Sequence, residues 1–353
     1  MNILITGGAG FAGSGIALYL RERYPSYRIV ALDNLKRRGS ELNLPRLSKA
    51  GIEFQHGDIR NREDLHFNNP FDMIIDASAE PSVLAGITSP IEQVVNNNLI
   101  GTLNCLELAK SHGAAFIFLS TSRVYPIAAL ESASFKEEET RFSWTDEQIL
   151  QGISSKGINE QFTLQGSRSF YGATKLASEL LIQEYNALAS MKTVINRCGV
   201  LTGPWQMGKV DQGVVVLWVA RHIYGGQLSY NGYGGTGKQV RDILHIHDLC
   251  RLIDWQIHHL EEINGEVFNV GGGQSGSVSL CELTRLCQNV TSREISIHSQ
   301  AKNRVADIRL YITDNSYVTN RTGWAPTISL SVIIQETAQW INSHKNELFS
   351  ILK

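Results

Sequence analysis

A tyrosine and a lysine four residues apart form the pair most able to do chemistry in this sequence. Tyr171 and Lys175 come directly before the helical run Leu176 to Ala189, and residues four apart share one face of a helix. A phenol is a poor base at neutral pH, but a nearby ammonium favours the phenolate and lowers the phenol pKa. The same pair also arises by chance on solvated helix surfaces, so its interpretation depends on the elements around it.

A strand that ends in hydroxyl-bearing residues comes earlier in the chain. The run Ala115 to Leu119 is almost entirely apolar, which is typical of a strand buried on both faces, and it leads through Ser120 to Thr121. A hydroxyl at the carboxyl end of a strand can hydrogen-bond to a sugar hydroxyl or to the oxyanion formed from it. Alternatively, Thr121 bonds only to the backbone of its own loop.

A glycine-rich turn follows the first expected strand, Asn2 to Thr6. Gly8, Gly10 and Gly13 fit the pattern G-x-G-x-x-G, and Gly7 begins the looser pattern G-x-x-G-x-x-G. Glycines at these positions allow a tight turn and bring backbone N–H groups and a helix N-terminus against a pyrophosphate. The turn therefore predicts a dinucleotide site, although a glycine-rich loop without a ligand has a similar pattern.

An acidic residue ends the second expected strand, Arg28 to Asp33, and lies 20 residues after Gly13. A carboxylate at this place accepts hydrogen bonds from the hydroxyls of an adenosine ribose and repels a 2′-phosphate. We therefore expect NAD rather than NADP. The three basic residues at 36–38 are either solvated loop charges or contacts to the phosphate side of the cofactor.

Strands and helices alternate through the first half of the chain. Further strands are expected at 71–79 and 193–197, and a long helix at 91–111. The alternation predicts an α/β fold with a Rossmann-type doubly wound parallel sheet, in which ligands bind at the carboxyl ends of the strands. We expect a dinucleotide-binding domain over 1–197, with return segments near 240–270, and a smaller substrate-binding lobe over 198–353. The polar stretch 126–168 is expected to form short helices or a flap on the substrate side.

Composition argues against several other classes of protein. The 353 residues are 42% hydrophobic and carry a net charge of −2, which gives no reason to expect nucleic acid or membrane as a partner. The five cysteines contain no Cys-x-x-Cys pair, which fits a reducing compartment. His245, His247 and Asp248 do not complete a metal-ligand set, so no metal is expected. Because the chain starts directly with a strand-like segment and has no membrane-length apolar run, we expect it to be cytoplasmic.

Together these motifs make the chain resemble the extended short-chain dehydrogenase/reductases, in the group of NAD-dependent nucleotide-sugar epimerases and dehydratases. The resemblance covers nearly the whole chain, and several ordered motifs are far more specific than any one of them. The motifs are Gly7 to Gly13, Asp33, Asp58-Ile59, Asn98 to Thr102, Ser120 to Tyr125, Tyr171 to Lys175 and Arg241 to Asp248.

The resemblance implies a role for each part of the candidate site. Thr121, Tyr171 and Lys175 would be the catalytic triad, and NAD would be tightly bound and needed only catalytically. Besides Tyr171 and Lys175, the residues implied in cofactor binding are Gly7, Gly10, Phe11, Ala12, Gly13, Asp33, Asn34, Asp58, Ile59, Ala77, Ser78, Ala79 and Asn98. Those implied in substrate binding are Ser122, Arg123, Arg197, Gln206, Gln212, Arg241 and Arg304, of which the last two would hold the diphosphate.

Two comparisons within the group narrow the expected function. Its dehydratases carry an Asp-Glu pair directly after the catalytic threonine, where this chain has Ser122-Arg123, so a dehydratase is disfavoured. The chain most resembles the CDP-paratose 2-epimerase branch, which implies inversion at C2 of a CDP-hexose in lipopolysaccharide O-antigen synthesis. The matching segments are 33–35, 56–61, 139–141, 211–213 and 237–242, and the departures are at 80–82 and 203–206.

Three other functions fit the same residues. A UDP-sugar 4-epimerase would use the triad with the sugar turned differently. A net nucleotide-sugar dehydrogenase or reductase would consume its cofactor, and an NAD-binding sensor would catalyse nothing. The expected partner in the leading interpretation is a CDP- or UDP-linked sugar, and relatives of this kind often form homodimers or larger homo-oligomers.

Overall fold

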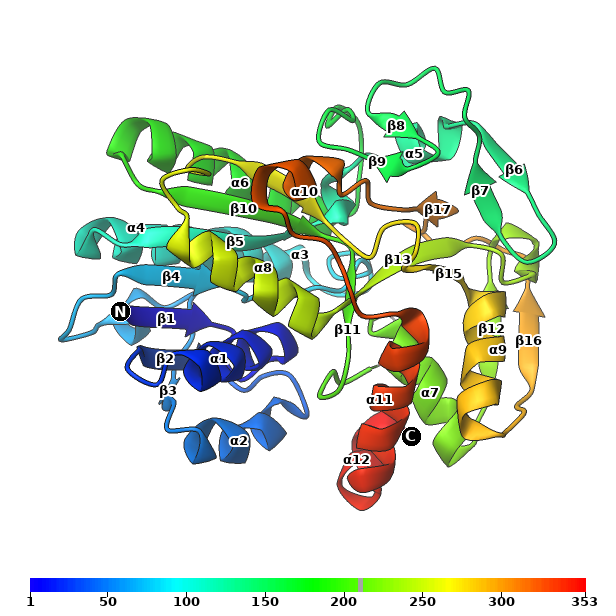
Figure 1. Cartoon of the computed structure of the whole chain (residues 1–353), viewed down its shortest axis with the longest axis horizontal. Coiled ribbons are helices and arrows are strands. Elements are labelled where there is room, and N and C mark those ends of the chain that lie inside the picture. Colours follow the sequence, from blue (N-terminus) through cyan, green and yellow to red (C-terminus); the bar gives the residue numbers. More distant parts are fainter. Residues whose placement is uncertain (209–211) are drawn as a thin grey trace. The chain divides into compact units, whose positions relative to one another are not determined.

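The structure of the chain, a computed structural model, describes residues 1–208 and 212–353 (Figure 1). It divides into two compact units. The first unit comprises Met1–Val124, Ser169–Cys198 and Leu249–Phe268, and the second comprises Tyr125–Arg168, Gly199–Asp248 and Asn269–Lys353. This division differs from the expected one in two places. Residues Tyr125–Arg168 belong to the second unit, and the return to the first unit starts at Leu249 rather than near 240.

A seven-stranded parallel sheet forms the centre of the first unit. Its strand order, β14-β10-β5-β4-β1-β2-β3, is that of a doubly wound Rossmann sheet and confirms the predicted fold class. All residues of β5 are buried, as its apolar sequence predicted. The strands are β1 (Asn2–Thr6), β2 (Arg28–Asp33), β3 (Glu53–His56), β4 (Met73–Asp76), β5 (Ala115–Thr121), β10 (Thr193–Cys198) and β14 (Val267–Val270).

Helices flank this sheet in the first unit. The helix expected at 91–111 is interrupted, because a π-helical turn, η3 (Asn96–Ile100), joins α3 (Ile91–Val95) to α4 (Gly101–His112). Such turns are rare and often lie at functional sites, and this one carries Asn98. Helix α6 (Phe170–Ala189) packs against α4 and against β5. The other elements are α1 (Phe11–Arg23), η1 (Ser40–Asn43), α2 (Leu44–Lys49), η2 (Arg62–Leu65), η4 (Ser122–Val124) and most of α8 (Ile246–His258).

The second unit contains a smaller four-stranded sheet and a group of packed helices. Helix α7 (Val214–Tyr224), which is buried along most of its length, packs against α9 (Leu280–Thr291) and α11 (Leu330–Ser343). The sheet is made of β11 (Val200–Thr202), β13 (Val240–His245), β15 (Ser277–Ser279) and β17 (Leu310–Tyr311). The remaining elements include the pair β12 (Leu228–Asn231) and β16 (Ile297–Gln300), η5 (Tyr233–Gly235), α10 (Ser316–Thr322) and α12 (Lys345–Leu352).

The polar segment that precedes α6 folds into short elements of the second unit. Helix α5 (Ile127–Ser132) is followed by two small antiparallel pairs, β6 (Phe135–Glu137) with β7 (Phe142–Trp144) and β8 (Ile153–Ser154) with β9 (Gly157–Ile158). The expectation of short helices is therefore only partly right, because most of the ordered structure here is hairpin.

Candidate active site

The start of α6 places Tyr171 and Lys175 in the first unit. Ser169 is the N-cap of this helix, and its side-chain oxygen accepts a hydrogen bond from the backbone N–H of Gly172, at 3.2 Å. The cap fixes where the helix begins, so Tyr171 lies in its first turn and Lys175 one turn later. The predicted common face of the two side chains is thus part of a regular helix.

Lys175 is buried without a hydrogen-bond partner among the described residues. Its side chain is 1% exposed, and Nζ lies 3.7 Å from the centre of the Phe118 ring on β5. Burial lowers the pKa of Lys175 to about 8, while the carboxylates of Asp76 and Glu179 act in the opposite direction. A buried ammonium with three donors and no acceptor fits a ligand that supplies oxygen atoms, such as the hydroxyls of a cofactor ribose.

Tyr171 is held in the same unit as the hydroxyl of Thr121. Burial raises the pKa of Tyr171 to about 12, and a hydrogen bond with the Thr121 side chain opposes that rise. Of the charged side chains, Arg123 lowers the Tyr171 pKa and Glu80 raises it. The Thr121 hydroxyl oxygen also accepts the backbone N–H of Arg123, at 3.2 Å. The structure therefore brings the three predicted triad residues to neighbouring elements of one unit.

Glu80 raises the pKa of Tyr171, although it was predicted to have no role beyond a departure from the family pattern. It lies in the loop that follows β4, and β4 is the neighbour of β5 in the sheet. That adjacency is the signal that would have found it, because the carboxyl ends of parallel strands meet at one edge of a sheet.

The glycine turn after β1 has the tight geometry that its pattern predicted. Gly7 has a φ of +63°, a conformation that favours glycine, and the backbone N–H of Gly10 donates to the Gly7 carbonyl at 2.9 Å. A Cβ atom on Gly13 would lie 2.2 Å from the same carbonyl oxygen. Helix α1 follows, and no side chain in the described part of the chain caps it, which leaves the first N–H groups, including those of Phe11 and Ala12, available to an anion. This cradle fits a pyrophosphate.

Asp33 at the end of β2 ties that strand to the glycine turn. Its carboxylate accepts hydrogen bonds from the backbone N–H of Ala9, at 3.1 Å, and of Leu35, at 2.8 Å. Burial raises the Asp33 pKa, and these N–H groups oppose the rise. The carboxylate is thus fixed next to the turn, where the hydroxyls of an adenosine ribose are expected.

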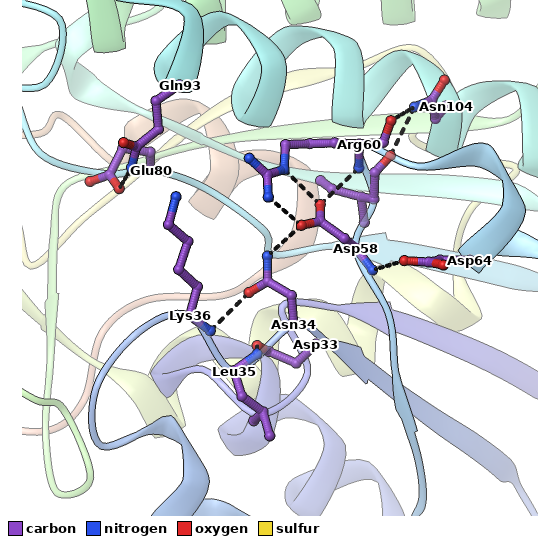
Figure 2. Close-up of polar contacts among 11 residues, drawn as sticks. Asp33, Asn34, Leu35, Lys36, Asp58, Arg60, Asp64, Glu80, Gln93 and Asn104 are labelled. Carbon is purple, nitrogen blue, oxygen red and sulfur yellow. Dashed lines mark hydrogen bonds and ion pairs between the residues drawn. The ribbon is translucent and has the colours of Figure 1, made fainter. Parts of the chain in front are cut away.

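Asn34 and Asp58 form a polar network beside Asp33 (Figure 2). The Asn34 amide donates to the Asp58 carboxylate at 2.9 Å, and the Arg60 guanidinium donates to the same carboxylate at 2.9 Å. The bonds from Arg60 hold the Asp58 pKa well below its usual range. The carbonyl of Ile59 accepts from the Asn104 side chain at 2.9 Å. Asp58 and Ile59 therefore lie together beside Asp33, with the Asp58 charge already balanced by Arg60, and their predicted contact with the cofactor stays a prediction.

The loop after β4, residues 77–79, lies against the glycine turn. A Cβ on Gly7 would come within 3.0 Å of the backbone of Ala77 and Ser78. Asn98, fully buried on η3, holds the loop from the other side, because it accepts the N–H of Glu80 at 2.7 Å and donates to the Glu80 carbonyl at 3.1 Å. The Asn98 amide thus positions this loop through its hydrogen bonds to Glu80. Its predicted direct contact with the cofactor stays a prediction.

Arg197, predicted to bind substrate, is a member of a buried ion pair. Its guanidinium lies 2.7 Å from the carboxylate of Glu179 on α6, and both residues are nearly inaccessible to solvent. Glu179 also accepts the hydroxyl of Ser120. These contacts join β5, β10 and α6 behind the triad. They indicate a structural role for Arg197 in place of the predicted substrate contact.

Two predicted substrate residues of the second unit lie in the loop before α7. The Gln206 amide donates to the carbonyl of Leu201 at 2.8 Å and accepts from the hydroxyl of Thr202 at 2.9 Å, so both its ends bind its own loop. The side-chain oxygen of Gln212 is buried and has no hydrogen-bond partner in the described part of the chain. Residue 211, part of one matching segment, lies outside the described residues.

The two arginines predicted to hold a diphosphate differ in their surroundings within the second unit. Arg241 on β13 pairs with the carboxylate of Asp307 at 2.8 Å and donates to the carbonyl of Ile308 at 2.6 Å. Arg304 is exposed, and no side-chain contact of its guanidinium is found among the described residues. Arg241 is therefore already oriented, whereas Arg304 is free to meet a ligand.

Two other kinds of feature are absent from residues 1–208 and 212–353. These residues contain no cluster of three or more His, Cys, Asp or Glu residues that could hold a metal ion. No helix within these ranges combines the length and the apolar character needed to cross a membrane.

Comparison with known proteins points to one family. The sequence pattern of the NAD dependent epimerase/dehydratase family matches residues 3–271. CDP-paratose 2-epimerase of Salmonella typhi is 31% identical over 351 residues, which cover 97% of this chain and 100% of that enzyme. UDP-glucose 4-epimerase of Thermotoga maritima, solved with UDP-glucose, has a TM-score of 0.77 and 25% identity over 98% of this chain and 100% of the other. dTDP-glucose 4,6-dehydratase of Bacillus anthracis, solved with NAD, has a TM-score of 0.77 and 26% identity over both complete chains.

The match extends over most of the chain and includes the glycine turn, Asp33 and the Tyr171–Lys175 pair. The glycine cradle and the unpartnered Lys175 ammonium fit NAD, the cofactor on which this family depends. The chain therefore belongs to the NAD-dependent epimerase/dehydratase family, whose members include epimerases and dehydratases of nucleotide sugars.

Proposed function

We propose that this enzyme inverts C2 of a CDP-hexose such as CDP-paratose. The observation that carries the proposal is the arrangement at the start of α6. There Tyr171 hydrogen-bonds with Thr121, and the buried Lys175 ammonium has no hydrogen-bond acceptor among the described residues. The likeness over nearly the whole chain to a CDP-paratose 2-epimerase supports this substrate over other nucleotide sugars. Ser122 and Arg123 follow Thr121 without adding the acid and base that loss of water requires.

The chemistry assigned to each residue follows from its environment. Tyr171, as the phenolate, removes the proton from the sugar hydroxyl, and Thr121 stabilises the resulting oxyanion by donating its hydroxyl proton. Lys175 binds the cofactor ribose and favours the phenolate. When bound, NAD would supply reversible hydride acceptance, so that no net oxidation of the sugar would occur. Tyr171 gives the proton back once the keto-sugar has presented its other face.

The second unit supplies the substrate-binding groups in this proposal. Arg241 and Arg304 bind the diphosphate, for which the planar guanidinium is well suited. The enzyme works in the cytoplasm, where CDP-sugars for O-antigen synthesis are made, and forms a homodimer or a larger homo-oligomer. The five free cysteines suit such a reducing compartment.

An NMR experiment tests the substrate and the mechanism together. The purified protein is incubated in D2O with CDP-glucose, CDP-paratose or UDP-glucose, without added NAD, and Tyr171→Phe serves as the inactive control. We expect inversion of a CDP-sugar at C2 without deuterium at carbon, because the hydride returns from within the protein. Deuterium at a sugar carbon would instead reveal a deprotonation route and would refute the hydride mechanism.

A UDP-sugar 4-epimerase is the second candidate, favoured by the likeness to the UDP-glucose-bound 4-epimerase of Thermotoga maritima. The same experiment separates the two, because conversion of UDP-glucose alone, at C4, would replace the proposed substrate. Stoichiometric formation of NADH would identify a net dehydrogenase. NAD binding without conversion of any nucleotide sugar would indicate an NAD-binding sensor.

A further inference from the structure

Two buried carboxylates act on the Lys175 ammonium, and their own surroundings differ. Glu179 lies one turn after Lys175 on α6 and is paired with the Arg197 guanidinium at 2.7 Å. Its charge is therefore largely balanced by a neighbour other than Lys175. Asp76, at the end of β4, is the second carboxylate.

Asp76 is fully buried, and every hydrogen bond to its side chain comes from a neutral donor. Its oxygens accept from the hydroxyl of Thr6 at 2.7 Å, the hydroxyl of Thr102 at 2.8 Å and the backbone N–H of Ser78 at 3.1 Å. The ion pairs of the described residues do not include Asp76. A buried carboxylate without a cation is costly, so a nearby positive charge is expected.

The sheet places Asp76 beside the ammonium of Lys175. Asp76 on β4 is the register partner of Phe118 on β5, and partners in a parallel pair project from the same face of the sheet. Lys175 Nζ lies over the Phe118 ring, at 3.7 Å from its centre. The bond from Thr102 shows that Asp76 faces α4, and α4 packs against α6.

The groups that face Lys175 come from three elements. Asp76 reaches it from β4, Glu179 from its own helix, and the thiol of Cys198 from β10. Burial raises the pKa of Cys198 to about 12, so this thiol carries no charge at neutral pH. Asp76 is consequently the facing anion whose charge no other side chain balances.

We propose that Asp76 is a positioning residue whose carboxylate is the buried counter-charge that keeps Lys175 protonated. It does so through space, without a direct salt bridge, and leaves all three ammonium protons free for the cofactor ribose. The consequence for catalysis rests on the proposed epimerase function, whereas the charge state of Lys175 does not. A role in packing alone would require the hydrogen bonds to Asp76 but not its charge.

The test follows the ionisation of Lys175 directly. Full-length protein saturated with NAD is labelled with 13C at lysine Cε, the Lys175 resonance is assigned by its loss in Lys175→Met, and its shift is recorded against pH. In Asp76→Asn we expect the Lys175 pKa to fall by about one unit or more, because an uncharged amide replaces the facing anion that no other side chain balances. The alkaline limb of the pH–kcat profile is expected to move down by the same amount.

Two control variants separate charge from structure. Asp72→Asn removes the same charge just before the opposite end of β4, from an exposed site, and is expected to leave the Lys175 pKa unchanged. Thr102→Val removes a hydrogen bond to Asp76 but keeps the carboxylate, so it is expected to lower the melting temperature and leave Lys175 protonated as before. An unchanged Lys175 pKa in folded Asp76→Asn overturns the proposal.

If Asp76→Asn does not fold, the wild-type protein still decides the question. Deprotonation of Lys175 should shift the 13C resonance of the Asp76 carboxyl carbon with the same midpoint, and a flat Asp76 signal contradicts the proposal. Both measurements work without a substrate. Failure to convert CDP-sugars would therefore refute the proposed function. The role of Asp76 would still be decided by the two NMR measurements alone.

Discussion

Lys175 in the first unit differs from Gln206 and Arg241 in the second unit in whether its polar atoms already have hydrogen-bond partners. In the first unit, the Lys175 ammonium is buried with no hydrogen-bond partner among the described residues, and helix α1 begins without a side-chain cap. In the second unit, Gln206 binds its own loop through both amide ends and Arg241 is paired with Asp307. Lys175 and the start of α1 are thus left for a ligand in the first unit, whereas Gln206 and Arg241 of the second unit already have partners.

This difference indicates which of these side chains is preorganised for a bound group. An unsatisfied buried donor costs free energy, so it persists where a ligand satisfies it. The first unit meets that condition at Lys175. In the second unit, a substitution of a partnered side chain is expected to change folding at least as much as binding.

The largest expected effect is on the chemical step in the first unit. Tyr171→Phe removes the proposed base and should lower kcat by about a thousandfold. Because the phenol hydroxyl contributes no cap or core packing, the melting temperature and the NAD content should stay close to wild type. Stopped assays by NMR measure kcat, and NAD is quantified after denaturation of the protein. A variant that keeps more than a tenth of the wild-type kcat would remove Tyr171 from the role of base.

The next largest effect is expected for Gly13→Ala, which changes the glycine turn itself. The added methyl group would lie 2.2 Å from the Gly7 carbonyl oxygen and 2.8 Å from its carbon, and backbone cannot turn aside as a side chain can. We expect a loss of about 3 kcal/mol in the free energy of unfolding and a clear loss of bound NAD, measured by denaturant titration and by cofactor content.

A matched change clarifies the effect at Gly13. Gly51→Ala introduces the same methyl group at a glycine of φ +68°, where the added Cβ would meet no described residue other than its chain neighbours within 4 Å, so it tests backbone strain without the clash. If Gly13→Ala were no more destabilising than Gly51→Ala, the close approach of the turn to α1 would not be the constraint.

Much of the first unit was predictable because its signals are local. The run Ala115 to Leu119 indicated a strand buried on both faces, and the spacing of Gly7, Gly10 and Gly13 indicated the turn between a strand and a helix. What was missed there depends on tertiary contacts. The π-helical turn at Asn96–Ile100 packs against α6, and the hydrogen bonds of Asn98 join it to Glu80, 18 residues earlier in the chain.

The second unit was harder to predict because it is assembled from distant segments. The stretch 126–168 joins segments that begin at 199 and at 269, and no periodicity in the sequence reports such a contact. Side-chain roles were ambiguous for the same reason. Arg197 and Gln206 have the residue types of substrate ligands, but partners 18 residues and four to five residues away, respectively, already use their polar atoms.

Substitution of Arg304 or Arg241 in the second unit is expected to have a smaller effect, mainly on KM for the nucleotide sugar. Arg304→Met should raise KM for the nucleotide sugar about tenfold and leave stability unchanged, because its side chain is exposed. Arg241→Met should raise KM and also lower the free energy of unfolding by about 1 kcal/mol, because Asp307 loses its partner. Steady-state kinetics and thermal unfolding distinguish the two. Equal effects on stability would contradict the difference in their surroundings.

The smallest effect is expected at Gln206 and tests whether partnered loop residues of the second unit bind substrate at all. Gln206→Ala removes two hydrogen bonds, to Leu201 and Thr202, and should lower the free energy of unfolding by about 1–2 kcal/mol. KM should change less than twofold, since neither amide end is free in the structure. Thr202→Val breaks one of the two bonds and should show about half the loss of stability. A tenfold rise in KM at unchanged stability would instead mean that Gln206 leaves its loop partners to bind the substrate, and the contrast between the two units would then not hold at this loop.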